Sequence, residues 1–271
     1  MIRDITIGQY FFGKSFIHKM DARMKILISL FFIILIFLCK NFFSLGLVAA
    51  FTVFILSISK IPFKLILKSL KPIIIIVVFT AFLNLFYTKG GKTLYEFWVF
   101  EITLKGVYSA IFMAVRIICL VAGTSLLTYT TTPTSLTNAI ESLLSPLKRL
   151  HVDVHTFAMM MTLALRFIPT LIEEIDRIMS AQKARGADLE SGGLVKRARA
   201  LIPIFIPLFV SAFRRAYELA YAMECRCYNG GKGRTSMKKM HFTYRDGVAF
   251  AVIALLTAGI FILNFNIRAV I

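Results

Sequence analysis

Acidic residues are scarce in this sequence, and no stretch of it carries a common catalytic motif. It contains 14 Asp and Glu against 32 Lys and Arg, so its formal net charge is +18. Such a balance in a soluble chain suggests a nucleic-acid ligand, but here the basic residues follow the boundaries of apolar runs and are not interleaved with exposed aromatic residues. Nucleic acid is therefore excluded as a partner. The absence of a GxxxxGK loop argues against ATP hydrolysis by this chain.

Cysteines are also few, and no secretion signal is visible. Cys39 and Cys119 lie in apolar runs, and Cys225 and Cys227 lie in a region predicted to face the cytoplasm, where thiols stay reduced. The sequence therefore predicts no disulfide framework. Residues 1–25 lack the charged start, apolar core and cleavage site of a signal peptide, so we expect the first apolar run to direct insertion.

Apolar residues, by contrast, are abundant. They make up 58% of the sequence, with 26 Phe and a mean hydropathy of +0.77. Soluble chains are roughly 45 to 50% apolar, so this is the composition of an integral membrane protein. Five apolar runs predict five spans: Ile26–Cys39, Asn41–Ile58, Pro72–Tyr87, Ile102–Leu127 and Gly247–Phe265. The first and third fall short of the usual span of about 20 residues, so they need a thinner bilayer or snorkelling lysines: Lys25, Lys40, Lys71 and Lys89.

The basic residues between the runs predict the topology, because cytoplasmic loops are enriched in Lys and Arg. Five precede the first run, four follow the second, and seventeen lie between Thr131 and Asp246. Only Lys40, a trio (Lys89, Lys92, Lys105) and Arg268 lie in the opposite segments. The sequence thus predicts an all-α membrane protein with a cytoplasmic N-terminus (1–25), four spans (26–128), a cytoplasmic helical domain (129–246), and a last span with a short external tail (247–271).

The cytoplasmic domain is predicted to contain a short amphipathic helix and two longer arms. The short helix begins near Thr131 and ends near Pro146. The first arm runs from about Val154 to Arg185, bending or restarting at Pro169, and a loop covers residues 187–200. The second arm follows Pro207 and ends at Arg226. Each arm is thus expected to begin after an Ile-Pro pair and to end in Ala, three residues, Arg and a small residue.

The two matched endings are the strongest functional signal in the sequence. In the first arm, Arg185 continues an apolar stripe that includes Ile178 and Gln182, and Gly186 suits the left-handed residue that closes a helix. The plain interpretation is a basic helix end that contacts lipid phosphates. The alternative is a plug for a partner's groove, since small residues allow close approach and a guanidinium binds a buried carboxylate.

At these residues the sequence resembles the transmembrane T component of energy-coupling-factor transporters, which take up vitamins and metal ions in prokaryotes. The resemblance covers nearly the whole chain and rests on "HKMDARMKIL", "LRFIPTLIEEI", "AQKARG" and "AMECRCY". It implies an ATPase-binding set of Gln182, Ala184, Arg185, Gly186, Cys225, Arg226 and Cys227. It also implies two cytoplasmic ATPases that carry ATP and Mg, a separate membrane-embedded S component that holds the cargo, and no cofactor bound by this non-catalytic chain.

The second ending departs from the family's Ala-Arg-Gly signature, because Cys225 and Cys227 stand where Ala and Gly are expected. Both cysteines are small, so close approach is still expected. A glycine turn directly after Arg226 is not.

Several other residues have alternatives that the sequence leaves open. Arg116, inside the fourth run, could couple subunits or could bond a neighbouring helix carbonyl. His151 and His155 have metal-ligand spacing, but no third ligand follows, so a metal site is disfavoured. The triplet "MMM" at 159–161 favours core packing over an adaptable sliding surface. Rival functions are a permease that conducts its own substrate and a membrane enzyme built on His18, Asp21, His151 and Asp153.

Overall fold

The computed structural model describes residues 10–87, 93–97, 100–150, 153–187, 193–230 and 241–266. Arg3, Lys89, Lys92, His151 and Arg268, which enter the predictions above, lie outside these ranges. The chain divides into two compact units, and each is described by itself. The bundle unit contains residues 8–139 and 239–271, and the arm unit contains residues 140–238.

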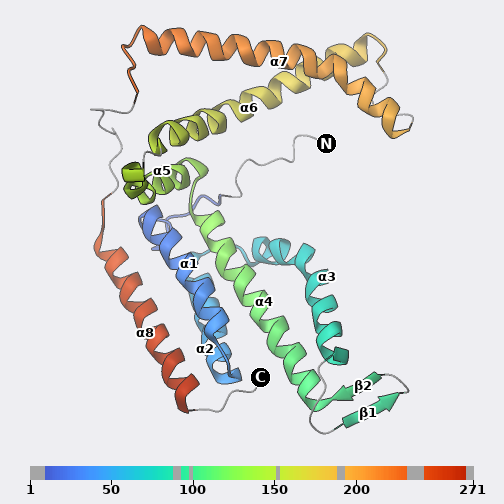
Figure 1. Cartoon of the computed structure of the whole chain (residues 1–271), viewed down its shortest axis with the longest axis vertical. Coiled ribbons are helices and arrows are strands. Elements are labelled where there is room, and N and C mark those ends of the chain that lie inside the picture. Colours follow the sequence, from blue (N-terminus) through green and yellow to red (C-terminus); the bar gives the residue numbers. More distant parts are fainter. Residues whose placement is uncertain are drawn as a thin grey trace. The chain divides into compact units, whose positions relative to one another are not determined.

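In its described residues the bundle unit contains five long helices, and the all-α prediction is confirmed. They are α1 (Ala22–Leu38), α2 (Phe42–Ser59), α3 (Phe63–Tyr87), α4 (Leu104–Thr130) and α8 (Tyr244–Asn266), as Figure 1 shows. They coincide with the five predicted apolar runs. A two-stranded antiparallel hairpin, β1 (Thr93–Phe97) and β2 (Phe100–Thr103), joins α3 to α4 and was not predicted.

The two runs that looked too short for a bilayer have different explanations. The third run is part of the 25-residue α3, which begins before Pro72 and keeps that proline inside the helix. The first run forms the 17-residue α1, at the lower limit of a span. The snorkelling prediction for Lys25 is wrong, because its side chain is buried and its Nζ donates to the carbonyls of Thr130 (2.9 Å) and His18 (3.4 Å).

A single apolar cluster holds α1, α2, α4 and α8 together. Its buried members are Phe32, Leu35, Ile36, Cys39, Val48, Cys119, Ile253, Leu256 and Ile260. Gly123 lets α4 approach α1, since a Cβ there would lie 2.2 Å from the Phe32 ring. Gly106 likewise allows α4 to approach the backbone of α3 at Leu85, whereas Gly46 faces open space. Two of the three glycines thus mark close helix contacts.

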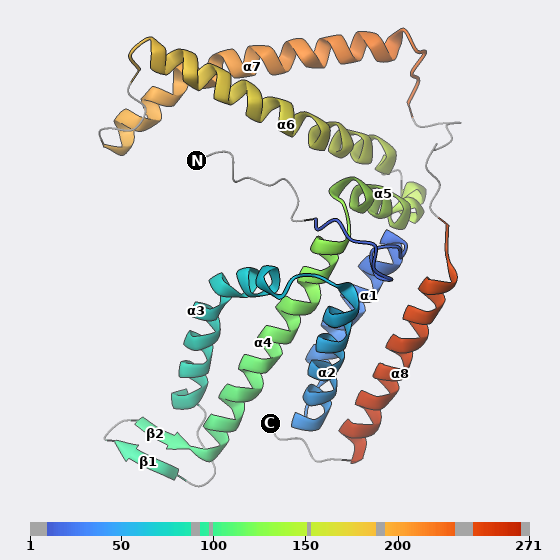
Figure 2. The same ribbon diagram turned by 180° about the vertical axis from the view of Figure 1, so that it is seen from behind.

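The arm unit contains the two longest helices of the described chain. The connecting α5 (Pro133–Leu143) is capped by Thr132, whose Oγ1 accepts from the Ser135 amide at 3.3 Å, and gives way to a 3₁₀ helix (Ser145–Leu150) near Pro146, as predicted. The arms are α6 (Val154–Ala184) and α7 (Leu194–Glu224). They cross each other, and their C-terminal ends lie at opposite extremes of the crossed pair in both views (Figures 1 and 2).

Both Ile-Pro pairs lie inside continuous helices, so neither pair begins an arm. The predicted helix start near Val154 is confirmed for the first arm, whereas the predicted start of the second arm is wrong. Residues 194–200, predicted as a loop, form the first turns of α7, which continues through Pro203 and Pro207. Pro207 has no N–H for the carbonyl four residues earlier, which is that of Pro203. The Gln182 side chain of α6 donates to this carbonyl at 3.4 Å. The Pro203 carbonyl thus accepts a hydrogen bond from the other arm in place of the one that Pro207 cannot donate.

By length and composition alone, six helices in the described part of the chain could cross a membrane. These are α2, α3, α4, α6, α8 and the part of α7 from Ala198 to Glu224. The chain is therefore a multi-pass membrane protein. The assignment of α6 and α7 to the cytoplasm stays a prediction.

Candidate functional site

The candidate site consists of the two arm ends, and contacts between the arms fix where those ends lie. Arg215 of α7 forms an ion pair with Glu174 of α6, with 3.1 Å between Nη2 and Oε2. Residues of the predicted α6 stripe, such as Ile175 and Ile178, are half-buried. The arms therefore brace each other near their crossing, while their C-terminal ends remain separate.

The first arm ends in a Schellman turn that is closed by glycine. The amide of Ala187 donates to the carbonyl of Gln182 (3.0 Å), and the amide of Gly186 donates to that of Lys183 (3.0 Å). Gly186 has φ +85°, the left-handed conformation that this motif needs. The prediction of a left-handed glycine after Arg185 is confirmed.

The second arm ends in the same turn without a glycine. The amide of Tyr228 donates to the carbonyl of Met223 (3.0 Å), and the amide of Cys227 donates to that of Glu224 (2.8 Å). Cys227 takes the place of the glycine, with φ +55°. A glycine turn after Arg226 was not expected, and the structure forms the turn without glycine, because the two bonds hold Cys227 in the left-handed region.

Arg185 and Arg226 occupy the same place in the two turns, directly before the left-handed residue. Both are exposed, and within the described residues neither guanidinium forms an ion pair or a side-chain hydrogen bond. Ala184 and Cys225, on their helical sides, are also exposed. Each arm end thus presents a guanidinium whose N–H donors have a fixed planar geometry, and small residues flank it on both sides. Gln182 differs from the rest of the predicted set, because its side chain contacts the other arm.

An exposed apolar face on α7 was not identified from the sequence. Phe205, Phe209 and Tyr217 are 60%, 65% and 63% exposed, and they lie at four- and eight-residue helical spacing. That spacing was the available signal, but periodicity does not tell whether a stripe faces a core or a partner. On α6, Met160 and Met161 are also exposed, so the core-packing interpretation is wrong for these two residues. Exposed apolar patches of this kind mark interaction surfaces.

Arg116 has a structural contact inside the bundle unit. Its Nη2 donates to the carbonyl of Cys39 at 2.6 Å, and its guanidinium lies 4.6 Å from the centre of the Phe112 ring. Cys39 is the C-cap of the short helix α1, so the arginine satisfies a carbonyl at that helix end. This supports the structural alternative, while a coupling role for Arg116 stays a prediction.

His18 and Asp21, the candidates for a membrane enzyme, have structural partners. The Nε2 of His18 lies 3.0 Å from the carbonyl of Phe11, which can only accept, so its Nδ1 accepts from the Ser15 hydroxyl at 2.7 Å. Burial lowers the pKa of His18, which favours this neutral form. Asp21 caps α1 by accepting from the amide of Arg23 (2.9 Å).

Asp246, at the start of α8, lies close to Asp21 at the start of α1, and the sequence analysis did not identify this contact. It is buried, and its carboxylate accepts from the amides of Asp21 (3.0 Å) and Thr243 (2.7 Å). It therefore ties the beginning of α8 to the beginning of α1. Its position as the acidic residue just before the last apolar run was the signal available in the sequence.

The metal alternative gains no support from the described residues. The Nδ1 of His155 lies 2.8 Å from Oε1 of Glu141, within hydrogen-bond distance. No group of three or more His, Cys, Asp or Glu side chains suited to a metal ion occurs among the residues that the structure describes. His151, the other half of the predicted pair, lies outside them.

Comparisons with known proteins match this chain over most of its length. The family described as CbiQ, cobalt transport protein, matches residues 13–237. The chain is 50% identical over 258 residues to the energy-coupling factor transporter transmembrane protein EcfT of Thermosediminibacter oceani, covering 95% of this chain and 97% of that protein. It is 52% identical over 250 residues to EcfT of Clostridium kluyveri (92% and 93% covered), and 43% identical over 264 residues to EcfT of Bacillus subtilis (97% and 100% covered).

Members of this family are transmembrane transporter components without catalytic activity, so the enzyme alternative is set aside. The sequence resemblance is confirmed by both the family match and the relatives, which cover nearly all of the chain. The chain belongs to the CbiQ/EcfT family of transmembrane components of energy-coupling factor transporters.

Proposed function

We propose that the two arm ends dock into two cytoplasmic ATPases, one end per ATPase, and pass their ATP-driven movement to the membrane. The observation that carries this proposal is the repeated geometry: two exposed arginines, each held before a left-handed residue by the same pair of backbone bonds. A guanidinium that leaves water needs a carboxylate partner with matching geometry. We expect each ATPase to supply one, and to carry the ATP and Mg itself.

The arrangement in the membrane follows from the charge distribution. The N-terminus and the arms face the cytoplasm, because the basic residues concentrate there, and α1, α2, α3, α4 and α8 form the five spans in the cell membrane. In this arrangement the arm ends lie on the same side as soluble ATPases.

The exposed apolar face of α7 is where we place the S component that holds the vitamin or other micronutrient. A membrane-embedded partner presents apolar helices, and Phe205, Phe209 and Tyr217 offer them aromatic contacts. The crossing contacts through Glu174 and Arg215 make the arms one lever, so movement at the arm ends reaches this face.

The test is the double variant Arg185→Glu/Arg226→Glu, with copurification of the ATPases and substrate uptake as readouts. Losing one partner of a buried charge pair costs about 2 to 5 kcal/mol, so both readouts should collapse. The control is Arg177→Glu/Arg214→Glu, which makes the same charge change at two exposed positions within the arms. Normal copurification and uptake in the first variant would overturn the proposal.

A permease that conducts its own substrate is distinguished by cargo binding. The purified chain, assayed directly with radiolabelled vitamins, should bind none of them without an S component. Saturable binding by the chain alone would favour the permease instead.

A further inference from the structure

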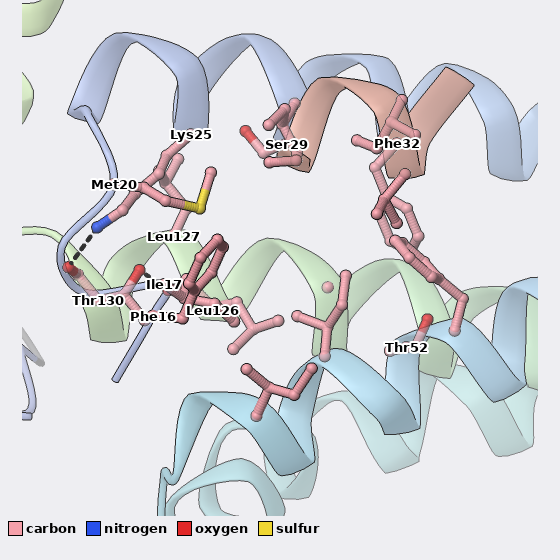
Figure 3. Close-up of a pocket in the computed structure, with 18 of the residues that line it drawn as sticks. Phe16, Ile17, Met20, Lys25, Ser29, Phe32, Thr52, Leu126, Leu127 and Thr130 are labelled. Atoms are coloured by element: carbon pink, nitrogen blue, oxygen red, sulfur yellow. Dashed lines mark hydrogen bonds between the residues drawn. The ribbon is translucent and has the colours of Figure 1, made fainter. Parts of the chain in front are cut away.

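A cavity of about 520 Å³ lies within the bundle unit, among α1, α2, α4, α8 and the segment before α1. Figure 3 shows that its walls are mostly carbon. Phe16, Ile17 and Met20 line one end together with Lys25, and Phe32 and Thr52 lie toward the other. The volume lies within the range of about 300 to 1,000 Å³ that holds small ligands.

The polar atoms in this wall are already satisfied. The hydroxyls of Ser29, Thr52 and Thr130 donate to carbonyls of their own helices, at 2.9, 2.8 and 2.7 Å. The amine of Lys25 donates to the carbonyls of Thr130 and His18 (Figure 3 draws the first). A ligand in the cavity therefore needs no hydrogen bonds, and an apolar space of this kind does not hold water.

The cavity also reaches lipid-facing positions. Phe54 and Ile58 of α2, and Val248 and Val252 of α8, line it and are themselves exposed. Hydrocarbon from the bilayer can therefore enter between α2 and α8. An acyl chain that moves from the bilayer into the cavity gains no hydrophobic free energy, because lipid tails are as apolar as these side chains. Dispersion contacts and a matching shape must therefore hold the acyl chain in place.

We infer that this cavity binds one acyl chain of a membrane phospholipid. A phospholipid fits better than an uncharged hydrocarbon, because Lys14 and Lys19 are exposed beside the segment that lines the Lys25 end. These amines can attract the phosphate of a head group while the chain fills the cavity. The inference does not depend on the docking of ATPases to the arms.

The experiment uses the full chain in nanodiscs made with a phosphatidylglycerol that carries a diazirine on one acyl chain. After irradiation, mass spectrometry should find the label concentrated on cavity residues such as Met20 and Phe51. In Ala249→Phe, whose new ring fills the cavity from α8, labelling of these residues should fall roughly tenfold. Ser29→Leu fills it from α1 and serves as a second variant if the first does not fold.

The matched control is Ala251→Phe, the same substitution two residues along α8 at an exposed position that does not line the cavity. It should leave the labelling unchanged. The inference is overturned if the label spreads evenly over lipid-facing residues, or if it persists in both filled variants. Stronger cavity labelling by a diazirine fatty acid in the same nanodiscs would overturn the phospholipid assignment.

Discussion

The end of α6 and the end of α7 form one backbone turn from different residues. In α6 the left-handed position is Gly186, which adopts φ +85° without steric cost. In α7 the same position is Cys227, and a residue with a Cβ pays about 1 to 2 kcal/mol for that conformation. The turn persists despite this cost. The comparison teaches that the feature shared by the arms is the position of the arginine before the turn, and the glycine is one means of achieving it.

The environments of the two ends differ less than their sequences do. Both arginines are exposed and follow helices of 31 residues that cross each other. Each helix also contains at least one interior proline. If the two ends bind equivalent sockets, single substitutions at Arg185 and Arg226 should have matching effects, and substitutions at the turns should reveal the difference in strain.

The largest effect is expected for the single variants Arg185→Glu and Arg226→Glu. Each should weaken binding of the ATPase pair by about 2 to 5 kcal/mol, which is roughly 30-fold to several thousandfold in affinity, because one buried carboxylate loses its partner. Titration of the detergent-purified chain with the ATPases measures both losses. Similar losses support equivalent ends, and a loss at only one end would show that a single arm carries the docking.

The next largest effect is expected for Gly186→Val. A β-branched residue at φ +85° destabilises the last turn of α6 by about 1 to 2 kcal/mol, so the Ala187 amide should exchange roughly 5 to 30 times faster. Gly193→Val is the control, since Gly193 has φ −69° and its Cβ would meet no atom within 4 Å. Equal exchange in the two variants would mean that the turn does not depend on glycine in this arm either.

The sequence predicted the parts of this site that follow from local rules. The half-buried stripe that includes Ile175 and Ile178 comes from helical spacing, and the left-handed Gly186 comes from glycine chemistry; both depend on only a few neighbouring residues. The second turn was missed because no local rule favours a left-handed cysteine, and only the paired backbone bonds show it.

The parts of the fold that depend on neighbouring residues were predicted from the sequence, and the parts that depend on distant contacts were not. The apolar runs predicted the five helices of the bundle unit, but the start of α7 was missed because Pro203 and Pro207 usually end a helix. The carbonyl of Pro203, which Pro207 leaves without an N–H donor, accepts instead from the side chain of Gln182, which is 21 residues away along the chain. The burial of Lys25 depends on a carbonyl 105 residues away, and no sequence window contains that contact.

The smallest effect is the sharpest test of the comparison, because it predicts opposite signs for one substitution at two neighbouring cysteines. Cys227→Gly removes the left-handed strain of about 1 to 2 kcal/mol but adds unfolded-state entropy, so the turn should gain less than about 1 kcal/mol. Cys225 has helical angles (φ −58°, ψ −23°), so Cys225→Gly should cost about 0.5 to 1 kcal/mol. Hydrogen exchange of the Tyr228 amide measures both changes in the stability of the turn. It should slow in Cys227→Gly and accelerate in Cys225→Gly. Acceleration in both would mean that Cys227 is not strained, and that its thiol or its Cβ stabilises the turn through contacts of its own.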